Sequence, residues 1–395
     1  MFADSEAKVR PECDVLTKAA RRRGGHCTFW KWYRRHVVAR LARVKRWEFW
    51  PAWAFYPPVV VYLLYLGLKY KNVTLFTAVN PAIPDGGFIG ESKYEILRGL
   101  ERSSSVPKTM LLNPKAADEQ VGAIEDFVRR EGLVFPIVLK PDAGQRGSGV
   151  SIVRSVGEVR DYVARATYPV IVQEYVSGLE FGVFYYRMPG KRTGRIFSIT
   201  EKVMPQVVGD GTNTLEELIL ADDRAVCMAE SYLRQNSTKA QSVLRDGERV
   251  QLVELGTHCR GAIFLDGRYA ITPALKKTMN QIARTFDGFY FGRFDIRVPS
   301  VEDLKAGRNL KVLELNGVTS EATNIYDPRY TLFDAYKVLF RQWRIAFEIG
   351  RRNRARGAQT TSLCRLLRAV LRYRQVSRAH KHQPSRELVP DFTLS

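Results

Sequence analysis

The chain has 395 residues, of which 45% are hydrophobic and 26% charged; this composition excludes a disordered protein and allows two or three domains. The net charge of +21 is uneven, because residues 1–46 carry 13 Lys/Arg against 4 Asp/Glu, residues 341–395 carry 13 against 3, and the remainder is nearly neutral. Such flanks favour an anionic partner: nucleic acid, anionic lipid or a polyanionic substrate. The five cysteines have no metal-ligand or redox spacing, which indicates reduced thiols and a cytoplasmic protein.

The N-terminal part combines basic and apolar segments. Residues 1–27 are expected to form a disordered basic tail, and helical spacing of apolar side chains predicts a basic amphipathic helix from residue 28 to about 47. Residues 49–68 carry no charge, a run long enough to span a bilayer, but Pro57 and Pro58 predict a break in it. A span would also place the basic flank outside. We therefore expect residues 28–72 to lie on the inner face of the cell membrane as a peripheral or monotopic segment, the alternative being a hairpin packed on the rest of the protein or at a dimer contact.

The rest of the chain alternates between strand and helix patterns. Residues 73–79 (VTLFTAV) are interpreted as a strand within a region 73–134 that precedes the main domain. The alternation continues to residue 330, which predicts an α+β fold. Residues 331–350 form an amphipathic pattern that predicts a packed helix ending at Gly350. Residues 351–395 are expected to contain a basic amphipathic helix, at 362–374, and a polar tail.

A strand, a glycine-rich loop and a second strand are predicted over residues 135–153. Lys140 ends the first strand, and the loop that follows can bring backbone N–H groups close to an anion. The spacing matches neither a Walker loop nor a Rossmann fingerprint, so the segment alone is also compatible with an ordinary hairpin. The loop residues in question are Gly144, Gly147, Ser148 and Gly149.

Two later strands place polar side chains in pairs. Period-two alternation puts Arg293 and Asp295 on one face of the strand GRFDIRV, and Glu314 and Asn316 on one face of the strand KVLELN. If these strands are neighbours, Asp295, Glu314 and Asn316 form an all-oxygen set suited to Mg²⁺. A further strand, residues 170–176 (VIVQEYV), ends in polar residues that can contact a purine, and Glu180 can accept from ribose hydroxyls.

Taken together and in this order, these segments resemble the ATP-grasp superfamily, from about residue 90 to 328. The likeness is greatest to its carboxylate–amine ligases, namely D-alanine–D-alanine ligases and the ATP-grasp part of cyanophycin synthetases. It implies an ATP-grasp fold, in which two α/β lobes hold ATP between them, over residues 135–330. The region before Lys93 offers one clear strand where these ligases have a full domain, so the N-terminal domain is expected to be reduced or replaced.

The resemblance also implies residue roles. The motif GESKYEIL makes Lys93 the first phosphate-binding lysine, and Lys202 lies where cyanophycin synthetases keep a basic residue. The expected metal-binding set is Asp295, Glu314 and Asn316, and Arg293 and Lys202 are the expected catalytic residues. The expected nucleotide-binding residues are Lys93, Lys140, Gly144, Gly147, Ser148, Gly149, Gln173, Glu174, Val176 and Glu180.

The activity that the resemblance implies is ATP-dependent ligation of a carboxylate to an amine through an acyl phosphate, with ATP and Mg²⁺ or Mn²⁺ as cofactors. The substrates are expected to be small or lipid-linked, and the partner surface an anionic membrane. The alternatives are an ATP-grasp phosphotransferase or acid–thiol ligase, and a non-catalytic membrane adaptor. Nucleic-acid binding is not expected, because the flanks contain no stacking platform or known module. The oligomeric state stays open, with a homodimer as one option.

Overall fold

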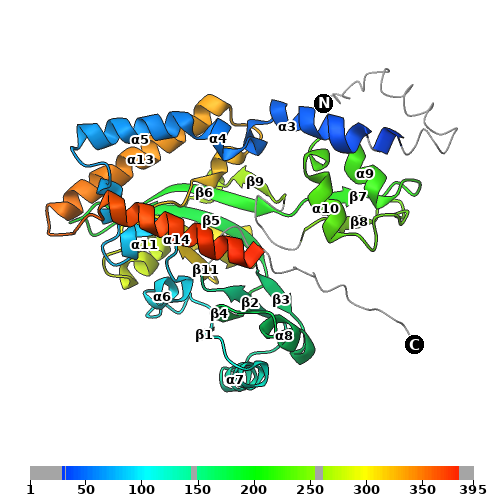
Figure 1. Ribbon diagram of the computed structural model, residues 1–395, viewed down its shortest axis with the longest axis horizontal. Helices are drawn as coiled ribbons and strands as arrows, with labels where there is room; N and C mark the ends of the chain where they lie inside the picture. The colour runs from blue at the N-terminus through cyan, green and yellow to red at the C-terminus, as the bar shows by residue number, and fades with distance from the viewer. Residues whose placement is uncertain (1–28, 32, 144–148, 254–260, 382–395) are drawn as a thin grey trace, which may run out of the picture. The chain divides into compact units, whose positions relative to one another are not determined.

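The computed structural model describes residues 29–31, 33–143, 149–253 and 261–381, the last eight of these by their backbone alone (Figure 1). The predictions for residues 1–27, Gly144, Gly147 and Ser148 therefore lie outside the described residues. The chain forms two compact units, one from residues 1–52 and 204–254 and the other from residues 53–203 and 255–395. The predicted α+β class is confirmed by separate antiparallel sheets and the helices that cover them.

The larger unit contains a four-stranded antiparallel sheet. One face of this sheet is covered by α7 (Ala117–Arg130) and α8 (Val156–Val163), whose apolar side chains share a core with the strands. Alternation along β2 points Ile137 and Leu139 into this core and leaves Lys140 on the opposite face. The strands in sheet order are β1 (Thr109–Leu112), β4 (Val170–Glu174), β2 (Ile137–Pro141) and β3 (Ser151–Val153).

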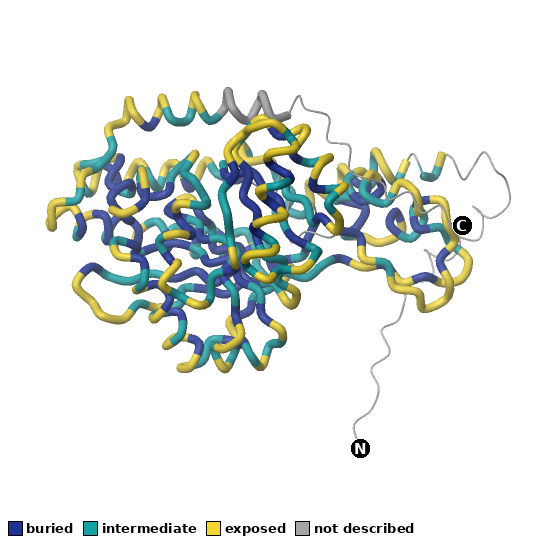
Figure 2. Tube along the Cα trace, turned by 90° about the horizontal axis from the view of Figure 1, so that it is seen from below, coloured by how far each residue is buried: buried dark blue, intermediate teal, exposed yellow. Residues whose placement is uncertain are grey.

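A five-stranded antiparallel sheet forms the centre of the same unit. Its apolar face packs on α6 (Lys93–Arg98), α11 (Pro273–Thr285) and α12 (Val301–Ala306), and Figure 2 shows the strands as a largely buried group. The strands in sheet order are β11 (Lys311–Asn316), β10 (Phe291–Val298), β5 (Leu179–Tyr186), β6 (Arg195–Val203) and β9 (Ile263–Asp266).

The opposite face of this sheet is divided into an apolar end and a polar end. At the apolar end Phe184 and Phe291 pack against α13 (Leu332–Arg354). At the polar end the same alternation brings out charged side chains, among them Asp295. Because α13 covers the apolar end, the charged groups are gathered over the other half of the sheet.

The strand predicted for residues 73–79 is wrong: the segment contains the 3₁₀ helix η3 (Leu75–Ala78). The Asn72 side chain accepts hydrogen bonds from Thr74 N and Oγ1 at 2.9 and 3.1 Å, which starts a turn. The Asn353 amide of α13 then donates to the carbonyls of Ala78 and Val79 at 2.9 and 3.0 Å. These side chains thus bond to backbone groups of the segment that a neighbouring strand would otherwise have paired with.

The helix predicted to stop at Gly350 runs on to Arg354. A Cβ atom at Gly350 would lie 2.3 Å from the carbonyl oxygen of Leu75, so the glycine allows η3 to approach the helix closely. Its role is contact between elements, not termination. The basic helix predicted at residues 362–374 is present as α14 (Leu363–Lys381), with Leu363, Leu367 and Leu371 exposed along one stripe.

The uncharged run is broken where Pro57 and Pro58 predicted it. It forms α4 (Ala52–Phe55) and α5 (Pro57–Lys69), which meet at Tyr56. One side of α5 lies along α13, as Figure 1 shows, with the rings of Tyr62 and Phe340 4.4 Å apart. Among the described residues, no helix is long and apolar enough to cross a membrane.

The smaller unit joins the N-terminal helix to an inserted segment. The predicted amphipathic helix is confirmed over the described residues, as a helical start from residue 29, the π-helical η1 (Arg34–Val38) and α3 (Ala39–Lys45). Ala39 is buried among the side chains of the inserted segment, and Arg43 donates to the carbonyl of Cys227 at 2.6 Å. The helix is therefore covered by protein at Ala39, with Trp30 and Ala42 partly packed, whereas the apolar side chains of Phe29, Tyr33, Leu41 and Val44 are exposed. The insertion comprises β7 (Gln206–Val208), α9 (Leu215–Ala221), η5 (Ala225–Met228), α10 (Ala229–Gln235) and β8 (Arg249–Gln251).

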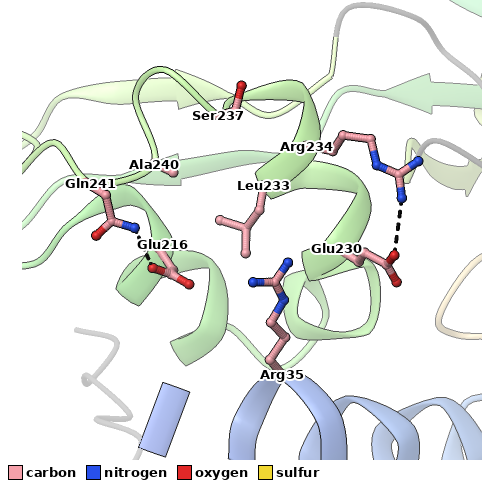
Figure 3. Close-up of a pocket in the computed structure, with 8 residues that line it drawn as sticks. All are labelled: Arg35, Glu216, Glu230, Leu233, Arg234, Ser237, Ala240 and Gln241. Carbon is pink, nitrogen blue, oxygen red and sulfur yellow. Dashed lines mark hydrogen bonds and ion pairs between the residues drawn. The ribbon is translucent and has the colours of Figure 1, made fainter. Parts of the chain in front are cut away.

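The smaller unit also contains a pocket of about 380 Å³, shown in Figure 3. In it, the Gln241 amide donates to Glu216 at 2.8 Å, and Arg234 pairs with Glu230 at 3.2 Å. None of the residues predicted from the sequence to bind nucleotide or metal lines this pocket. Its lining consists of Arg35, Glu216, Glu230, Leu233, Arg234, Ser237, Ala240 and Gln241.

Short 3₁₀ helices complete the chain between the main elements. They are η2 (Trp47–Phe49), η4 (Pro84–Gly86), η7 (Arg268–Ala270) and η8 (Thr323–Tyr326).

Candidate active site

Lys140 joins the two sheets of the larger unit. Its Nζ donates to Gln173 Oε1 at 3.0 Å on the neighbouring strand of its own sheet, and to the carbonyl of Leu313 on β11 at 3.1 Å. The side chain is only 7% exposed. A cation is therefore held where the four-stranded sheet meets the edge strand of the five-stranded sheet.

Lys93 lies at the start of α6, and its ammonium pairs with the Glu314 carboxylate of β11 at 3.0 Å. Asp142 fixes the start of the helix, because its carboxylate accepts from Tyr94 N at 2.9 Å and its carbonyl accepts from Lys93 N at 3.2 Å. Sequence reasoning missed Asp142, although its position two residues after Lys140 was a usable signal. One short segment thus positions both lysines.

The predicted metal-binding residues lie side by side. Asp295 is directly opposite Glu314 in the pairing of β10 with β11, and Arg293 is opposite Asn316. Asn316 Nδ2 donates to Asp295 Oδ2 at 3.4 Å, and Arg293 forms a two-pronged pair with Asp295 at 2.9 and 3.2 Å. The structure therefore brings all four side chains to one face.

Lys202 and Glu180 extend this face across β5 and β6. Lys202 Nζ lies 2.7 Å from Glu180 Oε1 and 3.4 Å from Asp295 Oδ1. Arg297 pairs with the other Glu180 oxygen at 3.4 Å and donates to the carbonyl of Val176 at 2.6 Å. Arg297 was missed, although it continues the alternation of Arg293 and Asp295.

The remaining nucleotide-binding candidates make internal contacts. Gln173 donates to Thr109 Oγ1 at 3.2 Å, and Glu174 Oε2 accepts from the backbone N–H of Lys108 at 3.0 Å. Gly149, the described member of the glycine loop, has φ +72° and closes tightly on Pro141. A side chain at Gly149 would be strained.

Burial and charge shift the pKa values of these groups in different directions. Burial lowers the pKa of Lys140 to about 8. Burial acts against ionisation of Asp295, but Arg293 and Lys202 outweigh it and lower its pKa to about 2. For Glu314 the opposing effect of burial is likewise exceeded, chiefly by Lys93, and its pKa is lowered. Both carboxylates are therefore ionised at neutral pH.

Five cations lie in this network beside three carboxylates, with which most of them pair, and Glu91, Asp142 and Glu321 lie at its border; such a group of cations can bind a polyanionic ligand such as a nucleotide triphosphate. The cations are Lys93, Lys140, Lys202, Arg293 and Arg297, and the carboxylates are Glu180, Asp295 and Glu314.

The same residues fit a divalent cation. In the described part of the chain no three His, Cys, Asp or Glu side chains are arranged to hold a metal, so the candidate set is two carboxylates and the Asn316 amide. Glu91 adds an observation: its Oε2 is buried and, among the described residues, has no hydrogen-bond partner. Burial raises the pKa of Glu91, and the charge of Glu314 acts in the same direction. A buried carboxylate oxygen in the field of Glu314 is a place where a hard cation relieves repulsion.

Comparison with known proteins gives relatives of one kind. The chain is 24% identical over 206 residues to a glutathione biosynthesis bifunctional protein of Streptococcus mutans, and 25% identical over 207 residues to the cyanophycin synthetase of Geminocystis herdmanii. The resemblance to ATP-grasp carboxylate–amine ligases is confirmed. The matches cover 46% and 47% of this chain but only 26% and 22% of the relatives, so the chain spans about a quarter of their length.

Solved ATP-grasp ligases are also found by structure. The D-alanine–D-alanine ligase of Bacillus anthracis complexed with ATP has a TM-score of 0.38 at 14% identity, with coverage of 67% of this chain and 68% of that one. A bifunctional glutathione synthetase from Pasteurella multocida has a TM-score of 0.37 at 17% identity, with coverage of 63% and 36%. No family model matches the chain.

Proposed function

We propose that the protein is an ATP-dependent ligase that phosphorylates a carboxylate and joins the acyl phosphate to an amine. One observation carries the proposal: charged side chains from both sheets lie together at one place. There Lys140 of the four-stranded sheet contacts β11 of the five-stranded sheet, and Lys93 pairs with Glu314 of β11. The sequence matches to a glutathione biosynthesis bifunctional protein and a cyanophycin synthetase support the same reaction class.

Lys93, Lys140 and the glycine loop would hold the phosphates of ATP. Several groups that would contact the nucleotide now make internal bonds, such as Glu180 with Lys202. When ATP binds, its phosphates and ribose hydroxyls can replace these internal bonding partners. No change of fold is needed, because the side chains that would bind ATP already lie on the polar half of the sheet face. Gln173, Glu174 and Val176 would lie along the base.

Asp295, Glu314 and Asn316 would hold Mg²⁺. When bound, the ion neutralises charge on the transferring phosphoryl group. Arg293 and Lys202, which flank Asp295 at 2.9 and 3.4 Å, would orient the acyl phosphate and stabilise its negative charge. The Asp295 carboxylate in turn fixes the guanidinium plane of Arg293 through two hydrogen bonds.

The reaction balances without an enzyme nucleophile. A carboxylate oxygen attacks the γ-phosphorus of ATP and ADP leaves, which converts a poor oxide leaving group into phosphate. The ammonium form of the second substrate first gives one proton to solvent, because only the neutral amine has a lone pair. The amine then attacks the acyl carbon, phosphate leaves, and the nitrogen gives up a second proton to solvent to form the amide. The site has to place two anions together, and its lysines and arginines would serve that purpose.

The test is ADP release by the full chain with Mg–ATP against pools of carboxylates and amines, including a membrane extract, with mass spectrometry of the product. Amide formation with one ADP and one phosphate per product is expected. A phosphorylated product without coupling would instead assign a phosphotransferase, and a thioester an acid–thiol ligase. If no carboxylate caused the protein to release ADP, the non-catalytic adaptor would be favoured.

Nucleotide affinity should depend on pH through Lys140. Its pKa of about 8 in the free protein is expected to rise when anionic phosphates bind, so above pH 8 the complex holds one more proton than the free protein. Affinity for Mg–ATP should therefore be flat below pH 8 and fall by up to about tenfold per pH unit above it. Binding titrations between pH 7 and 10 check this, and Lys140→Gln should bind weakly with no such slope. A slope that persists in the variant contradicts the assignment to Lys140.

We also propose that the outer face of α5 rests on an anionic membrane. Val61, Leu64 and Leu68 are exposed at helical spacing, and Trp53 on α4 is 80% exposed. These exposed apolar side chains suit the apolar part of a lipid surface, and the two strongly basic flanks of the chain favour anionic headgroups.

This face can be tested without deleting the segment, which matters because Phe55 on α4 and Val59 and Leu66 on the inner side of α5 belong to the core. The full chain should sediment with vesicles of phosphatidylglycerol and phosphatidylcholine, and Leu64→Glu/Leu68→Glu should weaken this binding about tenfold or more. Val134→Glu, at an exposed valine elsewhere, is the matched control. Unchanged vesicle binding would contradict the proposal. The proposal would also be contradicted if the wild-type protein were a dimer and the double variant a monomer, because the face would then bind a second copy of the chain.

A further inference from the structure

We infer that Arg297 is a positioning residue of the proposed nucleotide site: it ties the linker between the two sheets to β10 and holds the Glu180 carboxylate in place for the ribose. The inference rests on the proposed function, in which Glu180 contacts the nucleotide, and it specifies how that contact is built. The sequence analysis gave Arg297 no role.

The linker is short and lies at the surface. Residues 175–178 carry the chain from β4 in the four-stranded sheet to β5 in the five-stranded sheet, and Ser177 and Gly178 are exposed. Arg297 Nη1 donates a hydrogen bond to the linker backbone, at the carbonyl of Val176, over 2.6 Å. An exposed connection between two sheets is thereby fixed to a central strand of one of them.

The guanidinium of Arg297 makes two further contacts. Its Nη2 lies 3.4 Å from Glu180 Oε2, and its central carbon lies 5.6 Å from the ring centre of Tyr175. The strand register brings the pair together, because Arg297 is directly opposite Glu180 in the pairing of β10 with β5. A planar guanidinium can serve a carbonyl, a carboxylate and a ring at once, whereas a lysine ammonium is a single compact charge.

Gly178 supports the same junction. It has φ +113°, and a Cβ atom there would lie 2.4 Å from the carbonyl oxygen of Val298, the residue after Arg297. The linker therefore passes so close to the end of β10 that only glycine fits. The backbone and Arg297 together fix where β5 begins, two residues before Glu180.

Arg297 is placed at a cost to stability. Its side chain is 13% exposed, and its Nε–H is buried without a hydrogen-bond partner among the described residues. A buried donor without an acceptor destabilises the fold, so tying down the linker does not by itself account for an arginine here. Residues that break a stability rule in this way are typical of functional sites.

The Glu180 carboxylate is held from two sides. Lys202 Nζ lies 2.7 Å from Oε1, and Arg297 lies beside Oε2. In the proposed complex Lys202 would face the acyl phosphate, so Arg297 is the cation that would keep Glu180 oriented. The arginine would then act on the nucleotide through Glu180 and not by direct contact.

The test compares binding of Mg–ATP with binding of its 2′-deoxy and 3′-deoxy analogues to the full chain, by isothermal titration calorimetry. The wild type should bind at least one analogue about 10-fold or more weakly than ATP, because a hydroxyl that donates to a carboxylate is missing. Arg297→Gln should weaken ATP binding but affect that analogue much less, so the discrimination between them falls several-fold. Arg297→Lys keeps the charge without the forked contacts and should give an intermediate value.

Arg224→Gln is the matched control. Arg224, in the smaller unit, is 17% exposed, pairs with Glu48 and lies over the ring of Phe49 at 5.6 Å, so it makes the same kinds of contact as Arg297. Its loss should lower the melting temperature and leave the discrimination between ATP and the analogues unchanged. The double variant Arg297→Gln/Glu180→Gln should discriminate as Glu180→Gln does, because the two residues act as one unit.

Each outcome decides a different point. Equal weakening of ATP and both analogues in Arg297→Gln shows a merely structural role and overturns the inference. So does a wild type that binds ATP and both analogues alike, because Glu180 then does not hold the ribose; the ligase function, which is judged by ADP release and product, survives both results. If the wild type binds no Mg–ATP, the ligase function itself fails. Should Arg297→Gln not fold, Arg297→Lys provides the comparison: reduced discrimination supports the inference, and wild-type discrimination overturns it.

Discussion

Glu314→Gln is expected to reduce ADP release by about 100-fold or more while the fold remains intact. The substitution keeps the shape of the side chain but removes the negative charge that pairs with Lys93 at 3.0 Å and that would hold Mg²⁺ opposite Asp295. Since Lys93 and Glu314 both retain some exposure, water can replace their ion pair. We therefore expect the melting temperature to fall by less than about 4 °C.

The measurement is steady-state ADP release across a range of Mg²⁺ concentrations. A variant that has lost a metal ligand should need more Mg²⁺ for half-maximal rate, an effect that loss of a merely structural carboxylate does not produce. Glu119→Gln, at a glutamate of α7 that forms an exposed pair with Lys115, is the matched control and should retain full activity. If Glu314→Gln released ADP at the wild-type rate, the metal assignment would be wrong.

Lys140→Ala is expected to weaken Mg–ATP binding about 10- to 100-fold, the usual range for losing a hydrogen bond from a charged donor. Lys140 is the cation at the junction of the two sheets, and no other described side chain donates to both Gln173 and Leu313. Its removal leaves these two acceptors without that donor. It also relieves the cost of burying a charge, a cost seen in the lowered pKa of Lys140.

Because these two effects on stability oppose each other, the folded protein should survive the substitution, and the loss should appear in binding. Equilibrium titration with a fluorescent ATP analogue measures it. Lys115→Ala removes an exposed lysine and serves as the control. Wild-type affinity in Lys140→Ala would place the phosphates elsewhere and would leave the ligase proposal without its central contact.

The local features of the site followed from sequence. Strand alternation predicted that Arg293 and Asp295 share a face, and that Glu314 and Asn316 do, because the side-chain period of a strand is fixed by backbone geometry. The proline pair predicted the break at Tyr56 for a similarly local reason. The same local reasoning gave wrong predictions at two places. At residues 73–79 the distant Asn353 overrides the local strand preference, and at Gly350 the glycine permits the close approach of Leu75 and does not end the helix.

Contacts between distant segments could not be predicted in this way. Asp142 supports Lys93 across 49 positions and Arg297 reaches back to Val176 across 121, and neither separation leaves a periodic trace in the sequence. The pairing of the N-terminal basic helix with residues 204–254 is of the same kind, because the sequence pattern does not show that Ala39 is buried there or that Arg43 donates to the carbonyl of Cys227.

The amino-acid sequence by itself determined the α+β class, the order of the motif residues and the likeness to ATP-grasp ligases, because these depend on residue types and on short repeats along one strand or helix. Only the tertiary structure decided which charges meet. It placed Lys140 against β11, set Asp295 between Arg293 and Lys202, and brought Tyr56 to Glu321 from 265 positions away. The reason is physical: pKa shifts, ion pairing and ligand subsites depend on distance and burial, and a folded chain sets both through packing between segments far apart in sequence.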